Sequence, residues 1–268
     1  MHSIILTAHN KDWLINHVVN GILENTEGDY EVIFVIDGCS DRTEDVIFET
    51  IRSKDLKYKV AYAPDVFETK ANNIGFKLAE GDKVIVVQDD MIIKEPGWNL
   101  RMQEPFNAFD DVFAVTSRTA HNWIFNPDTQ HLNMEEDLDN CWCDICIHTD
   151  HATMKNTPRD VFAVRSSVNR GPLMIDHEDL KKMNYLDEEF APLDMDDHDL
   201  MYRMHKELGK VCGCYWIDFE SRDEWGGTRV SGSPAPWLLK ANHKNTKIFY
   251  NRHKDLIERQ GIIENRKL

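Results

Sequence analysis

The amino-acid sequence predicts an α/β protein whose central sheet is mostly parallel. Over the first hundred residues, apolar runs of strand length alternate with segments of helical periodicity, which is the pattern of strand–helix–strand units. The strand-length runs are continuously apolar, as expected for strands that helices cover on both faces. A chain of 268 residues can bury a sizeable core, so we expect one large domain or a domain with a smaller lobe.

The first elements follow one another closely along the chain. Residues 3–8, SIILTA, form the first expected strand, and Asp12 heads a helix with apolar residues on one face. Residues 31–37, EVIFVID, form the second strand, after which Ser40 or Asp41 caps a helix. The further expected elements are a weaker strand at 57–63, a helix at 69–79, strands at 83–89 and 112–118 with a helix at 98–109 between them, strands at 161–164 and 171–176, a helix at 177–184, and an amphipathic helix at about 242–259.

Charge and hydropathy exclude several classes of protein. The net charge is −16, from 47 acidic and 31 basic residues, whereas a nucleic-acid surface needs a basic footprint. A phosphate-bearing ligand that enters an acidic cleft needs a divalent cation beside it. The longest apolar runs are far shorter than a membrane span, and the N-terminus lacks the basic region and cleavage site of a signal peptide. We therefore expect a cytoplasmic protein without an integral membrane span, and peripheral attachment to a membrane stays open.

Six cysteines raise the question of a metal site. Three of them lie in the run CWCDICIH, at Cys141, Cys143 and Cys146. Thiolates and imidazoles bind zinc, and the other candidates for such a site are Cys212, Cys214, His148 and His151. The spacing is not that of two CxxC knuckles, and nothing in the sequence indicates an oxidising compartment. A structural zinc site and reduced, partly buried thiols both remain open.

The run VIVVQDDMII, residues 84–93, places two adjacent carboxylates at the end of an apolar strand. Asp89 and Asp90 repel one another, and burying either is costly unless a cation or hydrogen-bond donors compensate. In open sheets of this kind, ligands bind outside the carboxyl ends of the strands. Polar residues also follow the first two strands, at 7–10 and 37–40, so we expect three strand ends to converge on one ligand. The first strand is not followed by GxGxxG, so the dinucleotide-binding fingerprint is absent.

Four segments of the chain together carry a family resemblance. They are SIILTAHNKDWL, VIDGCSDRTEDVI, KANNIGFKLAEGDKVIVVQDDMIIKEPGW and LDEEFAPLDMDDHDLMYRMHKELGK. In this order and near these spacings, they resemble the inverting, nucleotide-sugar-dependent glycosyltransferases of family 2, which have the GT-A fold. The first two are similar to the family's strand ends at the nucleoside, the third to its DxD-type metal motif, and the fourth to the block that carries its catalytic base. Together they cover about two thirds of the chain.

The resemblance implies displacement at the anomeric carbon of a nucleotide-diphosphate sugar, with a UDP-sugar as the expected donor and a hydroxyl of a carbohydrate or another molecule as the acceptor. The leaving diphosphate gathers negative charge, which a divalent cation stabilises. Oxygen ligands suit Mn²⁺ or Mg²⁺, and the family pattern makes Asp90 the direct ligand, with Asp89 beside it at the ribose or a metal-bound water. Gln88 stands where the motif has its first acid, and it can accept from a ribose hydroxyl but brings no charge.

The same resemblance places the nucleotide at the strand ends. Thr7, His9 and Asn10 belong to the turn that meets the nucleoside, and His9 stands where an aromatic residue often stacks. Asp37 matches the acid that accepts the N–H of uracil, although a carboxylate at this position could equally cap the following turn. Asn73 belongs to the Ala-x-Asn-x-Gly helix and is expected at the nucleotide as well.

A direct, inverting displacement needs a general base that takes the acceptor's proton. By the resemblance, Asp197 aligns with the second acid of the family's Glu-Asp pair, and Asp196 stands at the first. Crowding by other carboxylates raises a carboxyl pKa toward that of a useful base, and capping of a helix by acids in its first turn is the alternative explanation. Some family members have a histidine as a third metal ligand, and the candidates for it here are Asp218, Glu220 and His243.

We therefore expect a single GT-A-like catalytic domain over residues 1–268. Residues 1–117 are the expected nucleotide-sugar-binding half, residues 118–160 a variable loop or lid, and residues 161–268 the acceptor-binding half with a C-terminal helix. Two alternatives stay open. A metal-dependent nucleotidyltransferase-like enzyme would share the first half but not need the block around Asp197. A catalytically silent protein that binds a nucleotide or carbohydrate is the non-enzymatic alternative.

Overall fold

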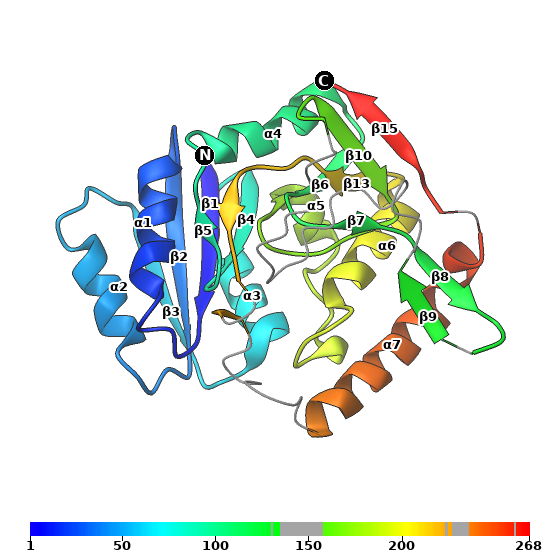
Figure 1. Cartoon of the computed structure of the whole chain (residues 1–268), viewed down its shortest axis with the longest axis horizontal. Coiled ribbons are helices and arrows are strands. Elements are labelled where there is room, and N and C mark those ends of the chain that lie inside the picture. The colour runs from blue at the N-terminus through cyan, green and yellow to red at the C-terminus, as the bar shows by residue number, and fades with distance from the viewer. Residues whose placement is uncertain (130, 135–157, 223–224, 227–235, 260) are drawn as a thin grey trace.

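The computed structural model describes residues 1–129, 131–134, 158–222, 225–226, 236–259 and 261–268. It confirms the expected α/β class, with a large central sheet between helices (Figure 1). In spatial order, the strands of this sheet are β15 (Glu264–Lys267), β10 (Val161–Arg165), β13 (Val211–Cys214), β6 (Val112–Thr116), β12 (Leu173–Asp176), β4 (Lys83–Gln88), β1 (His2–Ala8), β2 (Tyr30–Asp37) and β3 (Tyr58–Ala63).

Helices and short strand pairs complete the fold. The helices are α1 (Ile15–Asn25), α2 (Thr43–Ile51), α3 (Phe67–Leu78), α4 (Trp98–Ala108), α5 (His177–Lys182), α6 (Asp196–Leu208) and α7 (Pro236–Ile257), with a 3-10 helix at Glu188–Phe190. The short pairs are β5 (Ile92–Ile93) with β14 (Phe219–Glu220), β7 (Ala120–His121) with β11 (Ser167–Val168), and β8 (Trp123–Asn126) with β9 (His131–Met134). Among the described residues, no helix has the length and apolar character needed to cross a membrane.

Strand direction divides the sheet into two parts. β3, β2, β1 and β4 run parallel to one another, so their carboxyl ends lie at one edge. β12 runs antiparallel to both β4 and β6, and β13 is again parallel to β6. The four parallel strands therefore carry the polar strand ends that the sequence points to, and β12 begins the second half.

Two apolar clusters cover the two faces of the sheet. Ile4 and Leu6 of β1 belong to the cluster beneath α1, α2 and α4, whereas Ile5 belongs to the cluster beneath α3, α5 and α6 (Figure 1). All three side chains are fully buried. Because successive side chains of a strand point to opposite faces, burial on both sides requires an unbroken apolar run. This is the physical cause of the runs that the sequence shows.

Two glycines allow close approach near the polar edge. A Cβ atom at Gly75 of α3 would lie 2.4 Å from Cγ2 of Ile5, so a side chain there would push this helix away from β1. Gly38 follows β2 with a φ of +61°, and a Cβ atom there would lie 2.6 Å from the Cβ of Asp65. Both glycines lie in segments that carry the family resemblance, and here each has a packing cause.

The structure corrects the expected starts of two helices. α1 begins at Ile15 instead of near Asp12, because the N–H groups of Leu14 and Ile15 both bond to the Lys11 carbonyl in a preceding turn. α7 begins at Pro236, earlier than residue 242.

The segment 118–160, expected as a loop or lid, is in part regular. Residues 120–134 contain β7, β8 and β9, and β8 packs on α7, where the rings of Phe125 and Tyr250 stack at 4.3 Å. The partner of this hairpin lies far along the chain, so its stability cannot be read from local periodicity. Residues 135–157, which include the cysteine run, lie outside the described residues.

A buried ionic contact joins α6 to α7 and fixes the helix that carries the second group of acids. The fully buried carboxylate of Asp199 accepts hydrogen bonds from Arg203 Nε (2.7 Å) and, across the interface, from Arg252 Nη1 and His253 Nε2 (both 2.9 Å). Burial alone favours the protonated carboxyl, but the bond from His253 and the charge of Arg203 outweigh it and lower the pKa of Asp199. The charge of Asp199, which lies in the first turn of α6, therefore holds the start of this helix in place.

We expect Asp199→Asn to destabilise the protein by about 3 kcal/mol at pH 7, because two arginines then lose a buried counter-charge. Urea unfolding followed by circular dichroism measures the change. Asp255→Asn breaks an exposed ion pair with Lys206 and, as the control, should cost under about 1 kcal/mol. Folding lowers the pKa of Asp199, so its contribution is present at neutral pH and is lost as the pH falls below about 4. Equal costs for the two substitutions at pH 7 would contradict this view.

Candidate active site

The three polar strand ends meet, as expected from the sequence. β2, β1 and β4 are neighbours in the sheet. The backbone N–H of His9 donates to Asp89 Oδ2 (2.9 Å), and His9 Nδ1 lies 2.5 Å from the carbonyl oxygen of Asp37. The turn after the middle strand thus links the ends of its two neighbours, and residues from three separate segments form one polar edge.

Asp89 and Asp90 provide the chemistry for a divalent cation. Asp90 is 7% exposed, and its Oδ1 is buried without a hydrogen-bond partner. Burial raises the pKa of Asp89 to about 7; Lys11, with its Nζ 3.8 Å from Asp89 Oδ1, opposes this rise, and Asp90 adds to it. A carboxylate oxygen without a donor, beside a carboxyl that resists ionisation, fits a hard cation with oxygen ligands.

Within the described residues, no three His, Cys, Asp or Glu side chains are grouped closely enough to hold a metal ion. Glu220, one candidate for a third ligand, pairs with Lys94 at 3.2 Å and with Arg222 at 2.6 Å. Asp218 and the exposed His243 of α7 likewise form no such group with the two aspartates. The described residues therefore supply no third acidic or histidine side chain beside Asp89 and Asp90.

Asp37 is buried, and its carboxylate is bonded to backbone N–H groups at the start of α3. It is 2% exposed, and its two carboxylate oxygens accept the backbone N–H groups of Val66 (2.7 Å) and Phe67 (2.9 Å). The carboxylate therefore holds the start of α3 against the end of β2. A contact between Asp37 and a nucleobase would have to share these oxygens with the loop.

Thr7, His9 and Asn10 lie at the end of β1 and are partly exposed. The side-chain oxygen of Asn10 accepts the N–H of Ser40 (2.8 Å), and its nitrogen lies 3.2 Å from His9 Nε2. Since His9 Nδ1 is also bonded, both ring nitrogens have partners and the imidazole is held in one orientation.

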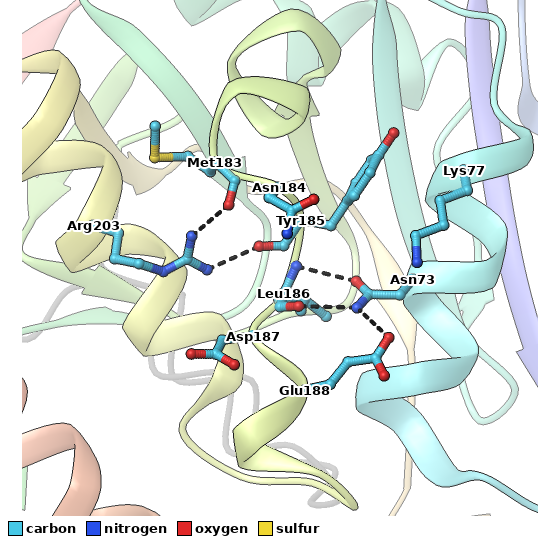
Figure 2. A pocket seen from close by; sticks show the side chains of 9 residues that line it. All are labelled: Asn73, Lys77, Met183, Asn184, Tyr185, Leu186, Asp187, Glu188 and Arg203. Atoms are coloured by element: carbon cyan, nitrogen blue, oxygen red, sulfur yellow. Dashed lines mark hydrogen bonds between the residues drawn. The ribbon is translucent and has the colours of Figure 1, made fainter.

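Asn73 is directed at a different part of the molecule. Its amide donates to the Leu186 carbonyl (2.9 Å) and to Glu188 Oε1 (3.2 Å), and it accepts the N–H of Leu186 (3.1 Å), as Figure 2 shows. It lines a cavity of about 450 Å³ between α3 and α6, with Lys77 and Arg203 also on the wall. Through these hydrogen bonds, Asn73 joins α3 to the segment 186–188.

Asp196 and Asp197, at the start of α6, are buried around Arg170. Its guanidinium contacts Asp196 Oδ1 through Nη2 and lies 3.5 Å from Asp197 Oδ2 through Nε, and the same Asp197 oxygen accepts the Arg170 backbone N–H (3.1 Å). Burial raises the pKa of Asp196 against the attraction of Arg170. Burial also disfavours the charge on Asp197, but His198, Arg170 and their backbone N–H groups outweigh it and lower its pKa. The expected rise in carboxyl pKa is therefore found at Asp196. At Asp197, the charges and N–H groups of Arg170 and His198 lower the pKa instead.

Four further charged residues of this centre have no recognisable pattern in the sequence: Lys11, Glu68, Arg118 and Arg170. Glu68 of α3 lies 3.6 Å from Arg170 Nη1, and Lys11 is 1% exposed beside the metal motif. Arg118 follows β6, is 9% exposed, and donates through Nη1 to Gln88 Oε1 (2.9 Å) and to the Arg170 carbonyl (3.0 Å). A buried group of acids needs counter-charges, which is a signal that cations are close, but the sequence does not say which of its basic residues they are.

A group of aromatic rings lies behind Asp197. His198 Nδ1 is 2.6 Å from Ser167 Oγ, and its Nε2 is 3.7 Å from Asp197 Oδ1. The ring centroids of His121 and Trp123 each lie 5.1 Å from that of His198. Both nitrogens of His121 are buried without a hydrogen-bond partner, and burial, helped by the charge of His198, lowers the pKa of His121 well below 6.5.

Three of the six cysteines lie among the described residues. Cys39 is partly exposed, and Cys212 and Cys214 are buried in β13, where burial raises the pKa of the Cys212 thiol. Cys141, Cys143 and Cys146 lie outside the described residues, and so does the proposed zinc cluster.

Comparison with known proteins identifies the family of the chain. The family model described as "Glycosyl transferase family 2" matches residues 3–170, which include all three polar strand ends. The chain therefore belongs to this family. It is 27% identical over 156 residues to "Uncharacterized glycosyltransferase alr2836" of Nostoc sp. strain PCC 7120, and the match covers 53% of this chain and 47% of that relative.

Solved structures with a similar fold support the GT-A assignment. GalNAc-T7 in complex with UDP, GalNAc and Mn²⁺ has a TM-score of 0.66 at 14% identity, over 96% of this chain and 49% of that chain. The mannosyltransferase PcManGT of Pyrobaculum calidifontis, with GDP-Man and Mn²⁺, has a TM-score of 0.54 at 15% identity, over 81% of this chain and 54% of that chain. Glucosyl-3-phosphoglycerate synthase of Mycobacterium tuberculosis, with Mn²⁺, UDP-glucose and phosphoglyceric acid, has a TM-score of 0.56 at 15% identity, over 94% of this chain and 79% of that chain.

At these identities the likeness shows the fold alone. The chain spans about half the length of the curated relative and of the GalNAc-T7 chain.

We expect His121 to weaken the protein in acid. Its ring, which faces His198 and Asp197 of α6, stays neutral in the folded state, whereas the unfolded chain takes up a proton near pH 6.5. His121→Phe keeps an aromatic ring and removes this proton uptake, so the variant should gain about 1.4 kcal/mol over the wild type per pH unit below that value.

Urea unfolding at pH 7.5 and pH 5.5 measures the gain. Trp123→Phe removes no titrating group and, as the control, should keep the pH dependence of the wild type. A stability difference between His121→Phe and the wild type that does not change with pH would show that the buried ring is protonated.

Proposed function

We propose that this protein is an inverting glycosyltransferase that moves a sugar from a UDP-sugar to a hydroxyl of a carbohydrate or another acceptor. The observation that carries the proposal is the pairing of two acid groups at one edge of the sheet. Asp90 has a buried carboxylate oxygen without a donor. Asp197 is linked through Arg170 and Arg118 to Gln88, the residue that precedes Asp89 and Asp90. Membership of the family and the nucleotide and Mn²⁺ complexes of three similar structures agree with it.

Asp90 and Asp89 are the proposed ligands of Mn²⁺ or Mg²⁺. When bound, the ion supplies positive charge for the departing diphosphate. Asp90 Oδ1 is the ligand atom we assign first, because it is buried and no group of the protein satisfies it. Gln88 is proposed at the ribose, where its amide can bond to a hydroxyl.

The nucleotide is proposed to lie along the ends of β1 and β2. Thr7, His9 and Asn10 are partly exposed there, and the bonded ring of His9 offers a fixed surface. We assign Asp37 a part in this site mainly through the loop 65–67 that it holds. The contacts of Asn73 give less support to its expected place at the nucleotide.

Asp197 is the proposed general base, with Asp196 as its neighbour. A base must be ionised before it reacts, and the groups around Asp197 that lower its pKa keep it so. The same groups make it a weak base, so it takes the acceptor's proton late, when that oxygen has begun to bond to the anomeric carbon and has become acidic. The bond between the anomeric carbon and the diphosphate oxygen breaks in the same displacement.

A thermal-shift panel of UDP- and GDP-sugars, with and without Mn²⁺, tests the proposal directly. A donor present at 100 times its Kd should raise the free energy of unfolding by about 2.7 kcal/mol. Release of free UDP on adding acceptors then reports turnover. If no nucleotide sugar stabilises the protein in the presence of Mn²⁺, the proposed function is wrong, and binding without turnover favours a silent binding protein.

Asp90→Asn should weaken Mn²⁺-dependent binding of UDP by at least about tenfold, because the site loses one of two carboxylate ligands. Isothermal titration with UDP, with and without Mn²⁺, measures the loss. Asp82→Asn is the control at the opposite end of β4, where the side chain is 85% exposed, and it should bind like the wild type. Wild-type affinity in Asp90→Asn would remove the metal ligand from the proposal.

Asp197→Asn should slow transfer by at least about 100-fold and leave UDP binding within about twofold, because the amide cannot accept the proton. Release of UDP in the presence of acceptor measures the rate, and circular dichroism checks the fold. Asp194→Asn, at a residue that accepts a bond from Asn242, is the control and should keep most of the activity. A rate within tenfold of the wild type would assign the base to another residue.

A further inference from the structure

Arg118 is a buried cation that forms no ion pair within the described structure, and it is 9% exposed. Its two hydrogen bonds go to neutral acceptors, the amide oxygen of Gln88 (2.9 Å) and the carbonyl oxygen of Arg170 (3.0 Å), and its Nε has no partner. Burying a guanidinium in this way costs free energy, because no direct ion pair replaces the water that it loses.

The neighbouring Arg170 shows the opposite situation. Its guanidinium contacts Asp196, lies 3.5 Å from Asp197 and lies 3.6 Å from Glu68. Three carboxylates of the fold therefore neutralise Arg170. No carboxylate of the described structure forms such an ion pair with Arg118, so its guanidinium keeps the capacity to bind an anionic group directly.

The charges around Arg118 indicate where its ligand lies. Burial lowers the pKa of Arg118 to about 10, and of the acids that oppose this, Asp90 acts most strongly, ahead of Glu68 and Asp197. In the structure, Arg118 reaches the proposed metal motif through its hydrogen bond to Gln88, the residue before Asp89. Position 88 carries a neutral amide, whereas a carboxylate there would pair with Arg118 and cancel its charge.

We propose that Arg118 binds an anionic oxygen group of the substrate, and we assign this group to the diphosphate of the nucleotide donor. The inference rests on the proposed function for the identity of that ligand. It gives the site a positive charge that is fixed in the protein and acts beside that of a divalent cation, where charge develops on the leaving group. Gln88 then orients the guanidinium without neutralising it.

Three variants separate the charge of Arg118 from its size. Arg118→Met removes the charge and keeps a long stem, Arg118→Lys keeps the charge, and Gln88→Glu places a carboxylate beside the guanidinium. The probes, titrated by calorimetry, are inorganic pyrophosphate without metal and UDP with Mn²⁺. We expect Arg118→Met and Gln88→Glu to weaken pyrophosphate binding at least about tenfold, and Arg118→Lys to stay within about threefold of the wild type.

Arg203→Met is the matched control, because Arg203 is paired with Asp199 and bonded to two backbone carbonyls. It should lower the melting temperature and leave pyrophosphate affinity within about twofold. Arg118→Met should lower the melting temperature of the ligand-free protein less than Arg203→Met does, because Arg118 forms no ion pair within the described structure and bonds only to neutral acceptors. A lower melting temperature for Arg118→Met together with wild-type pyrophosphate affinity would overturn the proposal.

The probes also distinguish the source of the anion from a failure of the proposed function. If Arg118→Met binds UDP and Mn²⁺ normally but loses a preference of the wild type for UDP-glucuronate over UDP-glucose, Arg118 binds a carboxylate of the sugar and the diphosphate assignment is wrong. If the wild type binds no nucleotide, the proposed function fails and pyrophosphate alone decides on Arg118. If Arg118→Met then binds pyrophosphate more weakly than the wild type, the result supports an anion site at Arg118. If the two bind pyrophosphate equally, or if the wild type does not bind it, the proposal is overturned.

Discussion

The edge of the parallel sheet buries more negative than positive charge, and the arrangement of the site follows from this imbalance. Within the described structure, the group consists of five carboxylates and three cations, namely Glu68, Asp89, Asp90, Asp196 and Asp197 with Lys11, Arg118 and Arg170. Asp89 and Asp196 resist ionisation chiefly because they are buried, and the negative charges of Asp90 and Asp197 beside them add to this effect. One divalent cation would balance the group.

The parallel half of the fold could be predicted because its causes are local. Strands covered on both faces must be continuously apolar, and β1, β2 and β4 show this in the sequence directly. The hairpin of β8 and β9 could not be predicted, because its stacking partner Tyr250 lies on α7, far along the chain. The start of α1 was misplaced for a related reason: Lys11, which looks like part of the helix, forms a turn and buries its side chain at the site.

The acids of the candidate site stand out in the sequence, whereas its cations do not. Asp89–Asp90 and Asp196–Asp197 are adjacent pairs in recognisable segments, so their unusual chemistry is visible in one sequence. Arg118 and Arg170 are single residues between strands, and only the crossing of β6, β12 and β4 brings them together. Asn73 shows the converse limit, because its motif places it on α3 correctly while its amide serves the contact with Leu186.

The two acid pairs have the same residue types and opposite surroundings, and this difference divides their proposed roles. Asp197 accepts two backbone N–H groups and lies against Arg170, so its charge is already satisfied and attracts a further cation weakly. Asp90 has a buried oxygen with no donor, so a cation there gains an interaction that the protein does not provide. This contrast supports our proposal that a metal ion binds at the end of β4 and not at the start of α6. In the proposed mechanism, Asp197 at the start of α6 then stays ionised and free of metal, which is the state that a base needs to take the proton of an acceptor hydroxyl.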